Sequence, residues 1–145
     1  MTNACLAIAI AGSSAAAIVD ARTGLIPDRL SGCAAGGTLV VAGLTGTLAP
    51  AAAGAAAVAG SLLLLFVATR GRGLGFGDVK LGVTIGAGCG AATGMLALGA
   101  AFVCGALYAV ALLVSGRARP QDAIPFAPFL AAGTLAAAAV RHLVW

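Results

Sequence analysis

Residues 70–94 read RGRGLGFGDVKLGVTIGAGCGAATG, and this stretch decides how the chain is organised. A basic, glycine-rich segment leads through a single acidic residue, Asp78, into a long apolar run. Glycine then recurs at every fourth position, at 82, 86, 90 and 94. Residues spaced by four lie near one face of a helix, and a glycine row on that face lets another helix approach closely. The pattern therefore predicts a helix that carries Asp78 into a helix–helix interface, and Gly12 and Ala16 before Asp20 form a matching small face.

The whole chain is poor in charge. Of its 145 residues, 61% are hydrophobic and 8% are charged, whereas about 25% are charged in an ordinary soluble domain. The mean hydropathy is +1.11. Because so few polar side chains could cover a water-facing surface, we expect the lipid bilayer to surround the fold. The net charge of +4 lies in short clusters between apolar runs, which indicates membrane topology and not nucleic-acid binding.

The apolar runs predict an all-α polytopic membrane protein, with residues 1–145 as one transmembrane domain. A spanning helix needs about 20 apolar residues. Six runs of suitable length are present, at about 3–19, 31–49, 51–69, 79–93, 94–115 and 124–142. A tight turn between the second and third runs is indicated by Gly46 and Pro50.

The fourth and fifth runs have no polar loop between them, and the distribution of charge separates them. Lys and Arg are enriched in cytoplasmic loops, and the charged clusters lie at 20–30, 70–80 and 116–122. If all three clusters are cytoplasmic, residues 81–116 must cross the membrane twice, with a turn near 90–94. Six crossings then leave both termini on the extracytoplasmic side.

Two aspartates lie at ends of predicted spans on the same membrane face. Asp20 ends the first span and Asp78 begins the fourth. A carboxylate beside a spanning segment is costly, so each is a candidate functional residue. If the two carboxyl groups meet at a low-dielectric boundary, they will not both ionise. A pair with one protonated and one ionised member is what aspartic proteases use, so we predict that Asp20 and Asp78 are a catalytic pair.

Other polar residues suggest different roles. Asp28 precedes the second predicted helix, where we expect it to cap free backbone amides. Lys80 lies two positions from Asp78, a spacing that does not bring side chains together on a helix, which leaves lipid headgroups or a substrate as its partners. The four cysteines are far apart in apolar runs, so we predict no metal site, and no feature indicates an organic cofactor. His142 has no nucleophile nearby in the sequence, which argues against a histidine triad.

Three segments together resemble the type IV prepilin peptidase family. Residues 20–28 (DARTGLIPD) resemble its first block, residues 73–81 (GLGFGDVKL) its Gly-x-Gly-Asp block, and residues 124–130 (IPFAPFL) a third block near the last helix. The resemblance covers nearly the whole chain in order and spacing, and each block falls at a predicted cytoplasmic membrane edge. The chain departs from the family pattern at Asp28, where Asn is frequent, and at Ala127, where Gly is frequent.

The resemblance implies a multi-pass aspartic endopeptidase of the bacterial plasma membrane. Its members cut the leader from prepilin or pseudopilin substrates at the cytoplasmic end of the substrate helix. By motif position, the catalytic pair would be Asp20 and Asp78, and the residues that shape the site or contact substrate would be Gly75, Gly77, Lys80, Pro27 and Pro125. Nothing matches the Cys-x-x-Cys domain of longer members, so we expect the peptidase-only form of tight-adherence pilus systems, without N-methyltransferase activity. The sequence leaves the oligomeric state open.

Two alternatives belong to other functional classes. A small transporter or channel also uses acidic residues in the membrane, but usually near the midplane and on broken helices. A non-catalytic subunit of a secretion assembly could keep the fold while losing one aspartate, whereas this chain has both.

Overall fold

A computed structural model of the chain describes residues 3–23, 28–117, 119 and 124–144, and all regular structure in these residues is helical. The helices are α1 (Asn3–Thr23), α2 (Asp28–Leu44), α3 (Leu48–Ala68), α4 (Phe76–Cys89), α5 (Ala91–Val114) and α6 (Ala127–Val144). The predicted all-α class is confirmed. By length and composition, α1, α3 and α5 are able to cross a membrane, whereas α2, α4 and the apolar part of α6 are shorter.

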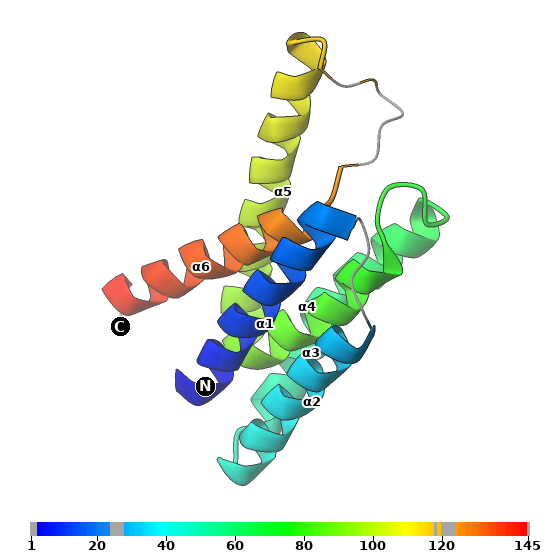
Figure 1. Ribbon diagram of the computed structural model, residues 1–145. Coiled ribbons are helices and arrows are strands. Elements are labelled where there is room, and N and C mark those ends of the chain that lie inside the picture. The colour runs from blue at the N-terminus through cyan, green and yellow to red at the C-terminus, as the bar shows by residue number, and fades with distance from the viewer. Residues whose placement is uncertain (1–2, 24–27, 118, 120–123, 145) are drawn as a thin grey trace.

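The short helix α4 lies at the centre of the molecule. It packs against each of the other five helices, most extensively against α3. Figure 1 shows α1 to α4 running side by side, with α5 extending beyond them at its C-terminal end and α6 lying beside α1. The two ends of the chain lie on the same side of the bundle (Figure 1).

Glycine and Asp78 set the bounds of α4, which differ from the predicted span of 79–93. The helix begins at Phe76, because the Asp78 side chain binds a free amide at its start. It ends at Cys89, because Gly90 has a φ of 81°, a conformation that L side chains rarely adopt. Gly90 therefore forms the turn that separates α4 from α5, within the region where the distribution of charge predicts it.

The glycine row of α4 faces α3. A Cβ at Gly82 would lie 2.7 Å from Leu62 Cδ1, and one at Gly86 would collide with the carbonyl oxygen of Gly54. The backbones of α3 and α4 therefore approach as closely as glycine allows. The row is shorter than the sequence suggests, because the helix stops before Gly90.

α1 contacts α4 through different residues from those of the glycine row. A Cβ at Gly88 would meet Ala9 and the carbonyl oxygen of Cys5, and one at Gly12 would lie 2.8 Å from Ala34 Cβ on α2 and 3.6 Å from Thr84 on α4. The small face of α1 therefore packs against both α2 and α4. This arrangement places the C-terminal part of α1, with Asp20, near the start of α4.

Candidate active site

Asp20 lies in the last turns of α1 and caps a different helix. Its side chain is 7% exposed. Its Oδ2 accepts a hydrogen bond of 3.2 Å from the backbone N–H of Ala127, the first residue of α6. The first amides of a helix have no partner within it and carry a partial positive charge. A carboxylate from another helix satisfies one of them here, and the contact holds Asp20 against the start of α6.

Asp78 lies in the first turn of α4 and is 6% exposed. Its Oδ2 accepts a hydrogen bond of 3.2 Å from the Gly75 N–H, while its own N–H donates to the Gly75 carbonyl oxygen at 3.1 Å. This is the half of a capping box in which the acidic residue reaches back to the N-cap amide. Its other oxygen, Oδ1, is buried and has no hydrogen-bond partner among the described residues.

The two carboxyl groups belong to one site. α1 packs against α4, and Asp20 is close enough to Asp78 for their charges to repel each other. Burial also disfavours the ionised form of a carboxyl group. Two buried carboxyl groups that interact in this way behave as one unit.

The glycines before Asp78 lie beside its side chain. Gly75 is exposed and supplies the amide that holds Asp78 Oδ2, while Gly77 is partly buried in the first turn of α4. A Cβ at Gly75 would lie 3.5 Å from Asp78 Oδ2, an ordinary contact. The local fold therefore does not require glycine at position 75, and the predicted role of an open approach to Asp78 stays a prediction.

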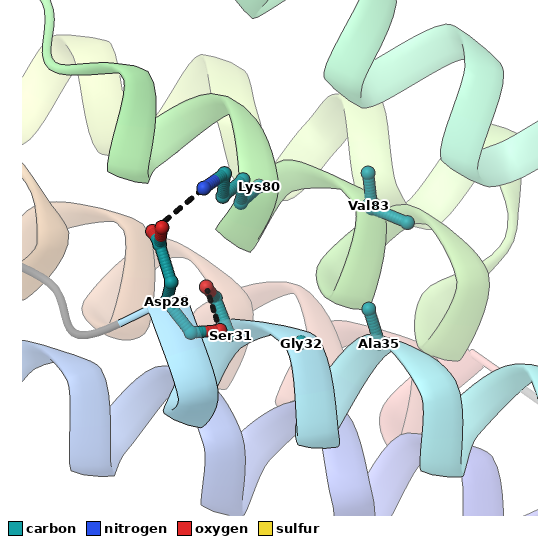
Figure 2. A pocket seen from close by; sticks show the side chains of 6 residues that line it. All are labelled: Asp28, Ser31, Gly32, Ala35, Lys80 and Val83. Carbon is teal, nitrogen blue, oxygen red and sulfur yellow. Dashed lines mark hydrogen bonds and ion pairs between the residues drawn. The ribbon is translucent and has the colours of Figure 1, made fainter.

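Lys80 points away from Asp78 and pairs with Asp28. Its Nζ lies 2.6 Å from Asp28 Oδ1 and 5.1 Å from the centroid of the Phe76 ring. Figure 2 shows this pair beside a hollow of about 240 Å³ between α2 and α4. Asp28 begins α2 as its first residue. Because the residues before it lie outside the described part of the chain, its capping role stays a prediction.

Pro125 and Lys80 line different hollows, and Pro27 lies outside the described residues. Pro125 lines a hollow of about 360 Å³ with residues of α1, α5 and the start of α6, namely Ala21, Tyr108, Ile124, Pro128 and Phe129. The hollow lies next to Asp20, which precedes Ala21 and binds the amide of Ala127. It is mostly apolar, as a site for a hydrophobic segment would be.

Three contacts of this site were not predicted from the sequence. The bond from Gly75 to Asp78 could have been found, because an acidic residue three positions after an N-cap is a known helix-start signal. No sequence signal identifies the bond from Ala127 to Asp20, which joins residues 107 positions apart, or the Lys80–Asp28 pair. Among the residues that the structure describes, His, Cys, Asp and Glu form no group of three that could hold a metal ion.

The helices and the paired carboxyl groups define a helical membrane protein with an acidic site at helix ends. The sequence profile of the type IV leader peptidase family matches residues 7–110, which is more than half of the chain. The chain therefore belongs to the type IV leader peptidase family, which is a family of peptidases. The matched region contains Asp20, Asp78 and Lys80 and ends before Pro125. Comparisons with curated proteins and with solved structures give no match.

Proposed function

We propose that the protein is an intramembrane aspartic endopeptidase that removes the leader from type IV prepilin-like or pseudopilin substrates at the cytoplasmic membrane boundary. Asp20 and Asp78 are its catalytic pair. The observation that carries the proposal is that two buried carboxyl groups from distant parts of the sequence lie on the packed helices α1 and α4, close enough to interact electrostatically, and that Oδ1 of Asp78 has no partner among the described residues. Membership of a peptidase family supports hydrolysis of a peptide bond as the reaction.

The paired carboxyl groups are suited to activating water without a covalent intermediate. The ionised aspartate takes a proton from water while the water oxygen attacks the peptide carbonyl. The protonated aspartate donates a hydrogen bond to the carbonyl oxygen, on which negative charge develops. Breakdown of the tetrahedral intermediate then cleaves the C–N bond, and a proton from the pair passes to the leaving amine. The backbone amides of Gly75 and Ala127 each bind one oxygen of a carboxyl group. These bonds fix the orientation of the second oxygen of each group for catalysis.

The proposed topology places this site at the cytoplasmic face of a bacterial plasma membrane. Six crossings with both termini extracytoplasmic put every basic residue except Arg141 on the cytoplasmic side. The common side of the two chain ends in Figure 1 supports an even number of crossings. Asp20 near the end of α1 and Asp78 at the start of α4 then lie at one membrane boundary, which favours a peptidase over a transporter with acids at the midplane.

The proposal is tested by replacing each aspartate with asparagine. Asp20→Asn and Asp78→Asn remove the ionisable group but keep side-chain size, so each should lower leader removal by about 10²–10⁴-fold or more. Leader removal is measured as a gel shift of a prepilin from the same organism that is co-expressed with each variant. Asp122→Asn, which removes another of the four carboxylates of the chain, is the matched control and should process normally. Normal processing by either the Asp20 or the Asp78 variant would refute the mechanism.

A further inference from the structure

An ion pair joins the start of α2 to the first turns of α4. Lys80 Nζ donates to Asp28 Oδ1 at 2.6 Å, and the two residues are 52 positions apart. In Figure 2 the two side chains reach toward each other across the space between the helices, beside the hollow lined by Ser31, Gly32, Ala35 and Val83. A charge-assisted hydrogen bond of this length is stronger than a neutral one, and it ties the first turns of α4 to the start of α2 at a point away from the helix axis.

Each partner of this pair lies close in sequence to one of the paired aspartates. Asp28 begins the helix that follows α1, which carries Asp20, and Lys80 follows Asp78 on α4. Residues two positions apart point to different sides of a helix. Asp78 accordingly interacts with Asp20, while Lys80 points to α2. The same turns of α4 therefore hold a carboxyl group on one side and an ion pair to α2 on another.

The contact between α4 and α3 contains no ion pair at its closest point. Glycines on α3 and α4 form their interface at Gly54 and Gly86, where backbone lies against backbone. This contact is made by uncharged residues, with Leu62 of α3 lying over Gly82. Near Asp78, by contrast, Lys80 lies 5.1 Å from the Phe76 ring centroid, and Phe76 contacts Phe66 of α3 at 5.6 Å between ring centroids. Lys80 therefore links α4 to α2, and Phe76 of the same helix contacts α3 beside the site.

We propose that Asp28 and Lys80 are positioning residues that fix the rotation of α4 and thereby direct Oδ1 of Asp78 toward Asp20. This inference rests on the proposed function, because it assigns the pair a role in the same reaction. Lys80 and Asp28 are 35% and 78% exposed, and ion pairs exposed to this degree contribute little to global stability. Catalytic rates are sensitive to alignment, so the role assigned to the pair is to align α4 and not to stabilise the fold.

The test is a double-mutant cycle on the full-length enzyme in lipid nanodiscs, with a full-length prepilin of the same organism as substrate. Asp28→Asn and Lys80→Gln should each lower kcat by roughly five-fold, a modest misalignment cost, with little change in KM. The double variant should lose no more than either single variant, because both remove one interaction. Lys80→Arg and Asp28→Glu keep the charges and should retain most of the activity. Arg29→Gln removes a charge from an exposed neighbour of Asp28 and should have no effect.

Three readouts separate positioning from other roles. A rise in KM for Lys80→Gln alone would mean that Lys80 contacts substrate, and would overturn the proposal. Opposite shifts in the pH profiles of the two single variants would also overturn it, because they would show a direct effect of charge on the aspartate pair. A kcat loss matched by a lower melting temperature would assign the pair a structural role instead. Positioning predicts unchanged melting temperatures and pH profiles of unchanged shape.

The aspartate variants keep this test distinct from that of the proposed function. If Asp20→Asn or Asp78→Asn cleaves prepilin normally, the proposed function fails whatever the ion pair does. If both are inactive while Asp28→Asn and Lys80→Gln keep full kcat, only the positioning role fails. Full activity of Asp28→Asn alone would fit a pure capping role, because Asn caps helices as well as Asp, and would likewise overturn the positioning role.

Discussion

α4 and α5 are consecutive apolar helices that meet at Gly90, and their surroundings differ completely. α4 has 14 residues, and nearly all of those from Asp78 onward are buried. α5 has 24 residues, and its buried positions, from Gly94 to Ala101, fall in its first half. Its second half exposes large apolar side chains, including Val103, Leu107 and Val110. Protein therefore surrounds α4, whereas lipid is the medium that suits most of α5.

The difference shows what each helix contributes to the proposed enzyme. A helix of 14 residues is about 21 Å long at 1.5 Å per residue, which is less than the roughly 30 Å of a bilayer core. A helix enclosed by protein does not need that length, and small residues let its neighbours close around it. α4 holds one carboxyl group of the site, while α5 provides membrane-facing surface and one wall of the hollow beside Asp20. Three matched pairs of substitutions test this contrast.

The largest effect is expected from a leucine placed at a glycine of each helix. A side chain at Gly86 would collide with the backbone of α3 at Gly54, whereas nothing lies within 4 Å of a Cβ at Gly99 on α5. Overpacking a tight interior costs about 1–3 kcal/mol, and more where backbone must move. Gly86→Leu should therefore abolish folded protein, measured as the monodisperse peak on size-exclusion chromatography in detergent, while Gly99→Leu should leave that peak intact. If the two variants behave alike, the difference in packing between α4 and α5 described above is wrong.

A smaller effect is expected from shortening one leucine on each helix. Leu81 on α4 is 0% exposed, whereas Leu107 on α5 is 67% exposed. Leu81→Ala leaves a cavity and should lower the free energy of unfolding by about 2–5 kcal/mol. Leu107→Ala should change it by less than about 0.5 kcal/mol, as exposed substitutions usually do. Thermal melting of the two variants in the same detergent measures the difference, and a large loss for Leu107→Ala would show that this part of α5 is covered by a partner.

Sequence patterns were sufficient for the all-α class and for locating six helices. Apolar runs and charge clusters are local signals, and solvation in a bilayer makes them strong. The break between α4 and α5 was also predicted, on the assumption that all three charged clusters lie on one side of the membrane, and the structure has a break there at Gly90. The exact helix ends did not follow, since they depend on contacts such as the one between Asp78 and Gly75.

Local sequence patterns could not show which helix packs against each face of α4. Spacing by four shows that Gly82 and Gly86 share a face, but it does not show that α3 and not α1 covers it. Likewise, the motifs predict Asp20 and Asp78 as partners, yet the bond from Ala127 to Asp20 depends on where α6 packs. Lys80 was correctly separated from Asp78 by its spacing, whereas its pairing with Asp28 depends on the packing of α2.

The smallest effect is expected from replacing a buried threonine of α4. It tests whether water is present in the protein interior around this helix. Thr84 on α4 is fully buried, and its hydroxyl oxygen has no hydrogen-bond partner among the described residues. Thr134 on α6 is equally buried, but its hydroxyl donates to the Leu130 carbonyl oxygen at 2.7 Å. Thr84→Val removes an unsatisfied polar group at nearly constant shape, so it should raise the free energy of unfolding by about 1 kcal/mol. This increase should appear as a melting temperature a few degrees higher.

Thr134→Val is the matched control for Thr84→Val. It removes a hydrogen bond that is already made, so it should lower the free energy of unfolding, by up to about 1 kcal/mol. If Thr84→Val is instead destabilising, its hydroxyl has a partner such as water in the membrane-embedded protein. α4 would then line a wet interior, and the contrast with α5 would lie in polarity as well as in burial. A stabilised Thr84→Val variant that keeps full peptidase activity would show that the Thr84 hydroxyl is not needed to supply water to the aspartates.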